Sequence, residues 1–227
     1  MALTPADQDA FFRAASPPRH AAKGECLIEA GSDFSSLLVI RSGIARKVRT
    51  LSDGTEQIVA MFVEGDSLNA GDVVFHQSQN AVYALTAATY VSIPHGKLKD
   101  LLDSRPAIAR ALWQETAAQA AIQQEWMIWL GQCTAQSRLA HFLCELSHRL
   151  QIASSEFGGA TEFPLTQNDL ADLLGMSTVH VNRSLQALRS RGLIELTRSR
   201  LLILDKKNLY SIAEFDPQYL IGQRRAG

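Results

Sequence analysis

The residues of this sequence that could do chemistry are concentrated between Ser177 and Arg200, where polar and basic side chains recur at helical spacing. Side chains of these types, carried on a helix in the major groove, contact base edges and phosphates of double-stranded DNA. Further along, Arg198 and Arg200 flank a hairpin that is too short to bury much surface. Phosphates are therefore the expected partners of these two arginines. The sequence therefore predicts a DNA-binding surface of nine residues: Ser177, Thr178, Val179, His180, Asn182, Arg183, Gln186, Arg198 and Arg200.

The charge of the chain supports this prediction locally rather than overall. Its 22 Lys and Arg residues and 23 Asp and Glu residues give a net charge of −1, which excludes a general polycation. Between Ser177 and Arg200, however, five arginines stand against the single Glu195. Such a local excess of positive charge is typical of a surface that neutralises phosphates and releases their counterions. The alternative is a basic helix face that is merely solvated.

Residues 165–204 have the pattern of a helix, a tight turn, a second helix and a short β-hairpin. Thr166 and Asp169 have the spacing of a capping box. Gly175 falls where the chain must turn sharply, and Ser177 can cap the second helix. The pattern predicts a winged helix-turn-helix. Its inward-facing positions are Leu170, Ala171 and Leu174 in the first helix and Val181, Leu185 and Leu188 in the second.

Residues 26–94 are strand-like, with β-branched and aromatic runs that glycines interrupt. Asp53-Gly54 is a hairpin signal between two apolar strands, 44–50 and 57–63, and Gly65-Asp66 breaks the chain again. Strands are also expected at 37–40 and, as a pair, within 81–93. Short antiparallel strands at this spacing predict a β-roll or barrel. A helix is expected to begin at Thr4-Pro5.

Residues 106–130 form one long predicted helix with two apolar faces. A helix of this kind needs two partners, which we expect to be the β-roll of its own chain and the same helix of a second subunit. The alternative is a helix buried inside one large domain. Gly131–Thr134 is expected to end it, and Thr134 to cap a helix over 135–151. The heptad seam is Ala109, Trp113, Thr116, Ala120, Gln123, Met127 and Leu130, and the second face is Ile108, Leu112, Ile122, Trp126 and Trp129.

These elements predict an α+β protein: a β-roll sensor domain with an N-terminal helix (1–105), a dimerisation helix (106–133) and a winged helix-turn-helix domain (134–227). The sequence contains no run of about 18 uncharged apolar residues, so no membrane span is predicted. Residues 1–15 lack the pattern of a signal peptide. Cys26, Cys133 and Cys144 lack disulfide-like or metal-like spacing, which favours the cytoplasm. Nucleophile-elbow, P-loop and zincin motifs are absent, so we expect no catalytic residues and no metal.

Over residues 20–205 the chain resembles the cyclic-AMP receptor protein/FNR (CRP/FNR) family of bacterial transcription regulators. The resemblance depends on the glycine spacing of the β-roll (Gly31, Gly43, Asp53-Gly54, Gly65-Asp66) and on the segment LTQNDLADLLGMSTVHVNRSLQALRSRGLI. It implies a homodimer on a two-fold symmetric, palindromic operator, with RNA polymerase as a further partner. It also implies that Arg183 contacts a guanine. Where many members have glutamate this chain has Val179, which can pack on a thymine methyl group.

The resemblance also implies where an effector would bind, and there the chain departs from the family. Members that bind cyclic nucleotides hold the ribose with a Gly-Glu pair and the cyclic phosphate with Arg-Ser or Arg-Thr. No arginine lies between Asp72 and Ala88, so the charge-assisted bonds to the phosphate are missing. We therefore expect no response to cyclic AMP. The corresponding pocket residues are Gly71, Asp72, Gln79 and Asn80, together with Gln123 and Gln124, which either contact a ligand or fix the register of the dimer helix.

Other functions stay open at this point. The protein can be a cyclic-nucleotide-responsive regulator with an atypical pocket, or a haem or redox sensor using His20, His76, His95, Cys26 or the hinge residue Cys133. An iron–sulfur cluster needs about four thiolates and is not expected. A ligand-binding module whose winged helix contacts proteins is a further alternative. No cofactor is predicted, and the effector is left unassigned.

Overall fold

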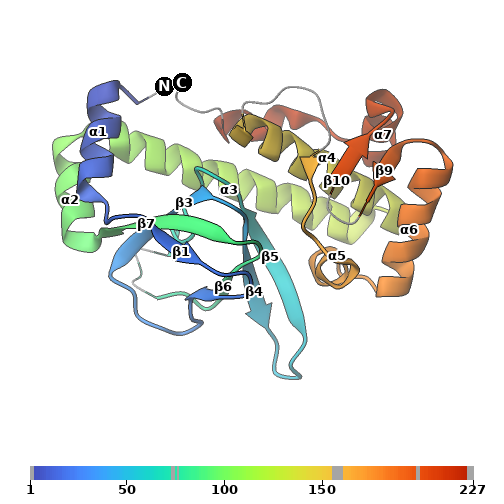
Figure 1. Cartoon of the computed structure of the whole chain (residues 1–227), viewed down its shortest axis with the longest axis horizontal. Helices are drawn as coiled ribbons and strands as arrows, with labels where there is room; N and C mark the ends of the chain where they lie inside the picture. Colours follow the sequence, from blue (N-terminus) through green and yellow to red (C-terminus); the bar gives the residue numbers. More distant parts are fainter. Residues whose placement is uncertain (1–2, 73–74, 76, 155–160, 198–199, 224–227) are drawn as a thin grey trace. The chain divides into compact units, whose positions relative to one another are not determined.

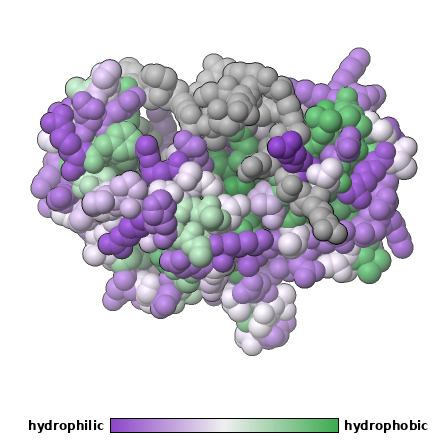
Figure 2. Space-filling model, viewed as in Figure 1, coloured by the Kyte–Doolittle hydropathy of each residue, from purple (hydrophilic) through white to green (hydrophobic). Residues whose placement is uncertain are grey.

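The computed structural model describes residues 3–72, 75, 77–154, 161–197 and 200–223. The chain up to Ala120 forms one compact unit, and Ala121–Ile221 forms a second. Two residues singled out above, His76 and Arg198, lie outside the described residues. No helix in the described ranges is long and apolar enough to cross a membrane. In Figure 2 hydrophilic residues make up much of the visible surface, because each unit buries an apolar core of its own.

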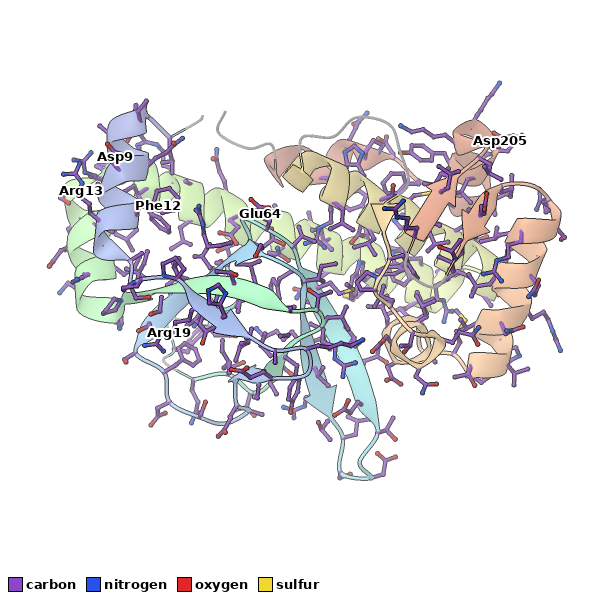
Figure 3. All side chains as sticks on the ribbon, in the orientation of Figure 1. Asp9, Phe12, Arg13, Arg19, Glu64 and Asp205 are labelled. Atoms are coloured by element: carbon purple, nitrogen blue, oxygen red, sulfur yellow. The ribbon has the colours of Figure 1, made fainter. Side chains whose placement is uncertain are left out.

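The first unit begins with helix α1 (Pro5–Ala14), which the sequence predicted from its cap. Thr4 accepts a hydrogen bond from the backbone N–H of Asp7 (3.2 Å), and the Asp7 carboxylate bonds back to Thr4, so the capping box is complete. One turn of this helix carries an ion pair between Asp9 and Arg13 (3.8 Å), both labelled in Figure 3. On the same helix the ring of Phe12 lies under the guanidinium of Arg41, 4.5 Å from the ring centroid.

Two antiparallel sheets follow and form the predicted β-roll (Figure 1). One has the order β1-β7-β3 and the other the order β2-β6-β4-β5. The space between them is filled by buried residues such as Ile40, Ala45, Phe62 and Val82. The strands are β1 (Arg19–Ala21), β2 (Cys26–Ile28), β3 (Ser36–Ser42), β4 (Ala45–Thr50), β5 (Glu56–Phe62), β6 (Ala81–Ala84) and β7 (Ala88–Pro94).

Two glycines of the β-roll occupy positions that other residues would strain. Gly54 has a φ of +85° and turns the chain between β4 and β5, where the sequence predicted a hairpin. Gly43 has a φ of +86°, and a Cβ at this position would overlap the carbonyl oxygen of Ala87. Both glycines are therefore required by backbone geometry.

Helix α2 (His95–Ser104) and the long helix α3 (Pro106–Gln132) come next. The predicted break at Gly131–Thr134 is confirmed, because α3 passes through Gly131 but ends at Gln132, and Thr134 caps the next helix by accepting from the backbone N–H of Ser137 (3.2 Å). A single glycine costs a helix only about 1 kcal/mol relative to alanine, which the packing of its neighbours can offset. Of the two apolar faces, the one with Ile108, Ile122, Trp126 and Trp129 is buried within the chain.

The second unit is built around helix α4 (Ala135–Ser154), whose residues Leu139, Phe142, Leu143 and Leu146 are fully buried. Helices α6 and α7 pack against it. Its other elements are β8 (Thr161–Glu162), α5 (Gln167–Leu174), α6 (Thr178–Ser190), β9 (Ile194–Leu196), β10 (Arg200–Ile203), α7 (Lys206–Ala213) and the 3₁₀ helix η1 (Pro217–Gln223). The strands form a small sheet of order β8-β10-β9, so the predicted winged helix-turn-helix is confirmed.

Strand β8 and the elements after the hairpin were not predicted. Strand β8 contains two residues, which is too short to show a periodic pattern. Helix α7 is capped by the preceding residue Asp205, labelled in Figure 3, whose carboxylate accepts from the backbone N–H of Asn208 (3.0 Å). This hydrogen bond also lowers the pKa of Asp205.

Candidate nucleic-acid interface

The turn between α5 and α6 is fixed by local hydrogen bonds that the sequence predicted. Thr166 caps α5 and accepts from the backbone N–H of Asp169 (3.1 Å). Gly175 ends α5 in the left-handed region, with a φ of 58°. Ser177 caps α6 and accepts from the backbone N–H of His180 (3.3 Å). These contacts set the direction in which α6 leaves the turn, and therefore which of its faces is exposed.

Helix α6 buries one face in the second unit and presents the other to solvent. Val181, Leu185 and Leu188 are buried, together with Ser184. The opposite face carries the predicted DNA-binding residues, all of which are exposed: Ser177, Thr178, Val179, His180, Asn182, Arg183 and Gln186. Within the described part of the chain, Arg183 forms no hydrogen bond or ion pair that would hold its guanidinium. Its five N–H donors are available for a partner.

Val179 is an unusual residue for such an exposed position. Its side chain is 65% exposed, near the N-terminal end of α6. An exposed valine one turn before an arginine offers an apolar contact beside a hydrogen-bonding one. In a major groove those two groups can contact a thymine methyl group and a guanine edge, respectively.

Arg189 has a role that the sequence did not reveal. Helical spacing alone puts Arg189 on the outer face of α6, but its Nη2 donates to the backbone carbonyl of Leu196 in β9 (2.8 Å). The guanidinium therefore joins the end of α6 to the hairpin. Arg200 is the first residue of β10 and its side chain is exposed. Its backbone carbonyl accepts from the N–H of Thr197 (2.9 Å). A shift of the hairpin would move Arg200 as well.

Arg138, on the first turn of α4, makes a second contact that sequence reasoning missed. Its guanidinium donates to the carbonyls of Trp129 (3.1 Å) and Leu130 (2.9 Å) near the end of α3, and to that of Leu174 (2.7 Å) at the end of α5. A further bond reaches the carbonyl of Cys133 (3.3 Å). The last carbonyls of a helix lack partners inside it and favour a cation. An arginine just after a helix break was the only signal in the sequence.

The predicted effector residues of the β-roll lie among charges that come from β4. Lys47 forms an ion pair with Asp72, and both side chains are largely buried. Arg49, two residues further along the same strand, donates through Nη1 to the backbone carbonyl of Gln79 (2.8 Å). The lack of arginine between Asp72 and Ala88 therefore does not mean that this part of the β-roll lacks a guanidinium. Arg49 is supplied by a strand that is distant in sequence, so the sequence of the segment alone does not reveal it.

The remaining predicted effector residues are exposed or make only local hydrogen bonds. Asn80 bonds through its backbone to the hydroxyl of the buried Ser78, at 3.2 Å for the N–H and 3.0 Å for the carbonyl. Gly71 is exposed, and so are Gln123 and Gln124 on α3. Among the described residues, no group of three or more His, Cys, Asp or Glu side chains is arranged to hold a metal ion.

A buried carboxyl group joins α3 to the β-roll within the first unit. Glu115 accepts from the hydroxyl of Ser67 (2.6 Å) and from its backbone N–H. Burial raises the pKa of Glu115 to about 7, with Asp66 adding a smaller contribution in the same direction. This group can therefore change its charge near neutral pH. Sequence patterns do not reveal it, because Glu115 lies between the two apolar faces of the helix.

Comparisons with known proteins agree with this architecture. Residues 18–105 match the model of the cyclic nucleotide-binding domain, and residues 137–212 match that of the Crp-like helix-turn-helix domain. The transcriptional activator protein FnrA of Stutzerimonas stutzeri is 27% identical over 215 residues, covering 94% of this chain and 87% of the relative. The nitrogen fixation regulation protein FixK of Azorhizobium caulinodans is 29% identical over 169 residues, covering 74% of this chain and 67% of the relative.

A solved structure supports the same fold. FixK2 from Bradyrhizobium japonicum matches with a TM-score of 0.77 and 24% sequence identity, covering 86% of this chain and 96% of that one. A β-roll, a long helix and a winged helix-turn-helix follow one another in this chain, and the two family models match the first and the last of these parts. The chain belongs to the CRP/FNR family of bacterial DNA-binding transcription regulators.

Proposed function

We propose that this regulator acts as a homodimer and reads a two-fold symmetric operator with the exposed face of α6. The observation that carries the proposal is the free face of that helix, where Arg183 and Val179 are exposed side by side on a rigid support. Arg183 donates two of its five N–H hydrogens to O6 and N7 of a guanine, and Val179 packs on a thymine methyl group. Thr178, His180, Asn182 and Gln186 contact further base edges or phosphates.

The hairpin and the helix ends anchor the backbone of the DNA in this proposal. Arg200, and Arg198 two residues before it in the sequence, contact phosphates. Arg189 is a positioning residue, because its bond to Leu196 holds the hairpin at the end of α6. Arg138 positions the helix-turn-helix in a similar way, by joining the ends of α3 and α5.

The dimer is formed along α3, on the face that the chain itself does not cover. Trp113 and Met127 are each 74% exposed, which is rare for side chains of this size. Both belong to the heptad seam, which also includes Thr116, Ala120 and Leu130. A second copy of α3 would bury this seam as in a parallel coiled coil. The domain limits proposed from the sequence, 1–105, 106–133 and 134–227, separate sensing, dimerisation and DNA binding.

Binding-site selection with the purified protein is the test of this function. The expected result is a palindromic sequence whose half-sites lie about one helical turn apart. Affinity for this sequence should fall steeply with rising salt, and Arg183→Ala should relax the preference at one base pair in each half-site. Enrichment of no sequence, or binding that salt does not weaken, would contradict the proposal.

We further propose that the β-roll does not respond to cyclic AMP. The carboxylate of Asp72, which would hold the ribose hydroxyls, is already paired with Lys47. A ribose would therefore have to share this carboxylate with Lys47. RNA polymerase is the proposed partner on DNA, the cytoplasm the proposed location, and no catalytic activity is proposed.

One observation favours a cyclic-nucleotide-responsive regulator as the second candidate. Arg49 brings a guanidinium to the backbone of Gln79, where the family has the arginine that holds the phosphate. Calorimetry with cyclic AMP on the parent protein and on Arg49→Ala separates the two candidates. Micromolar binding that Arg49→Ala abolishes would support the second candidate, and the absence of binding would support the first.

A further inference from the structure

A row of polar side chains, buried except for the half-buried Tyr219, connects several elements of the second unit. Glu145 on α4 accepts from the indole Nε1–H of Trp126 on α3 (3.0 Å) and lies 3.5 Å from Nη1 of Arg149. The side chains of Glu145 and Arg149 are each 1% exposed. Water therefore cannot satisfy these groups, and each hydrogen atom among them must be accounted for.

The hydroxyl group of Tyr219 connects Glu145 to a histidine. Its oxygen lies 3.0 Å from Oε2 of Glu145 and 3.1 Å from Nε2 of His141. The other ring nitrogen of His141, Nδ1, lies 3.0 Å from the backbone carbonyl of Ala213. A carbonyl oxygen can only accept, so Nδ1 carries a hydrogen. Three short contacts thus connect Glu145, Tyr219, His141 and the carbonyl of Ala213, and Tyr219 has one hydrogen to donate.

If all three contacts are hydrogen bonds, these side chains together hold one proton more than an ionised carboxylate and a neutral imidazole would supply. If Tyr219 donates to Glu145, Nε2 of His141 must also carry a hydrogen, which makes the ring a cation. If Tyr219 donates to Nε2, Glu145 must carry a hydrogen and donate it to Tyr219. In both arrangements all three contacts are hydrogen bonds, and without the extra proton one of them is lost.

The surroundings decide which group carries the proton. Burial raises the pKa of Glu145, which favours a neutral carboxyl group. Burial lowers the pKa of His141, which favours a neutral ring, and the pKa of Tyr219 is raised, so its hydroxyl keeps its hydrogen. The ring of His141 lies against those of Phe215 (5.1 Å between centroids) and Trp129 (5.8 Å), which cannot solvate a cation as water does.

Other charged and titratable groups face Glu145, Tyr219 and His141 from three helices, α3, α4 and α7. Arg149 on α4 acts on both Glu145 and Tyr219 and favours an ionised carboxylate, but desolvation is the larger effect at Glu145. Glu125 on α3 raises the pKa of Tyr219. Near Phe215, which packs on His141, lie the rings of His148 on α4 and Tyr210 on α7. Lys206 on α7 helps to lower the pKa of His148, although burial is the larger cause.

We propose that Glu145, Tyr219 and His141 form a one-proton site that fastens the C-terminal segment to α4. Glu145 donates its proton to the oxygen of Tyr219, Tyr219 donates to Nε2 of His141, and Nδ1 of His141 donates to the carbonyl of Ala213. The site thereby holds both the end of α7, at Ala213, and η1, at Tyr219. Figure 1 labels α7 and α4, the two helices that it joins.

Loss of the proton would leave two acceptors, the Glu145 carboxylate and Nε2 of His141, facing a single hydroxyl hydrogen. One of the contacts at Tyr219 would then be broken, and the attachment of η1 would weaken. Because the pKa of Glu145 is higher in the folded protein than in the unfolded chain, its stabilising contribution is present at low pH. This contribution is lost as the pH rises through the folded-state pKa.

The direct test is nitrogen NMR of the His141 ring in the full chain at neutral pH. The proposal requires the neutral tautomer with hydrogen on Nδ1 and with Nε2 as an acceptor. An imidazolium ring, or hydrogen on Nε2 alone, would overturn it. Tyr219→Phe removes the hydroxyl but keeps the ring packing. It should shift the Nε2 signal toward that of a free nitrogen and increase amide exchange in 206–220, and an unchanged Nε2 signal would also overturn the proposal.

Urea unfolding as a function of pH gives an independent readout. Glu145→Gln cannot release a proton, whichever way its amide faces, so its unfolding free energy should lack the contribution of Glu145. Above the pKa of a glutamate in an unfolded chain, the unfolding free energy of the parent should fall more steeply with rising pH than that of the variant, until the pH passes the folded-state pKa of Glu145. Glu115 contributes equally to both proteins and cancels. Equal slopes would show that Glu145 is ionised in the folded protein and would overturn the proposal, even if the variant is less stable.

Discussion

Replacing Arg138 by methionine tests how far one guanidinium holds the helix-turn-helix in place. The change keeps a long aliphatic side chain, so the packing of the stem is largely retained. It removes the hydrogen bonds to the carbonyls of Trp129, Leu130 and Cys133 and the bond to Leu174. The ends of α3 and α5 would then lose their common cation.

The size of the effect follows from the contacts. Hydrogen bonds to a charged group contribute about 1.5–3 kcal/mol each, and a cation at a helix C-terminus adds about 0.3–1 kcal/mol. The four bonds share one side chain and are not additive, and Arg138 is only half-buried, so solvent replaces part of the loss. We therefore expect Arg138→Met to lower the free energy of unfolding by about 2–4 kcal/mol. Arg138→Lys keeps the positive charge but not the planar guanidinium that reaches several carbonyls at once. It should lower the free energy of unfolding by about half as much.

Urea unfolding followed by tryptophan fluorescence measures this loss, because Trp126 and Trp129 are buried in the same unit. Arg110→Met is the matched control. Arg110 is exposed on α3 and has no hydrogen bond in the described part of the chain, so the effect should be within about 0.5 kcal/mol. A similarly small effect for Arg138→Met would refute the view that this residue holds the two helix ends together.

Three further changes test the interface and the buried carboxyl group. Arg183→Ala should cost about 1–3 kcal/mol of binding free energy on the selected operator and little on random DNA; an equal loss on both, measured by titration, would make Arg183 a phosphate contact. Arg200→Ala should weaken binding to all sequences alike and reduce the salt slope by about one; an unchanged slope would exclude that role. Glu115→Gln should flatten the pH dependence of unfolding, because the pKa of Glu115 is raised to about 7 and its contribution is lost as the pH rises through that value. Identical pH profiles of parent and Glu115→Gln would contradict this.

Local sequence signals predicted many elements of this fold, though not α2, β8 or α7, because each signal acts within a few residues. Thr166 and Asp169 cap a helix through contacts three residues apart, and Gly175 turns the chain by its own φ of 58°. The hairpin at Gly54 depends in the same way on one residue with a positive φ. The exposed face of α6 followed from helical periodicity alone. In these places the chemistry of a residue and its position in the chain are sufficient.

Contacts between distant segments could not be predicted in this way. The sequence contains no arginine between Asp72 and Ala88, and that observation alone suggested a β-roll pocket without a guanidinium. Strand pairing instead brings Arg49 to Gln79, 30 residues away, and places Lys47 beside Asp72. The periodicity that identifies a strand says which residues share its face, but not which loop that face meets.

The residues that escaped prediction share a physical property that explains why. Arg138, Arg189 and Glu115 each use a charged group to satisfy polar atoms of another element. The apolar pattern fixes which faces of the helices are buried, but a buried apolar face tolerates small shifts and rotations. Directed hydrogen bonds to backbone groups tolerate much less, because they weaken steeply with angle and distance. The orientation of α6 and of its hairpin therefore depends on a few polar contacts that leave no periodic trace in the sequence.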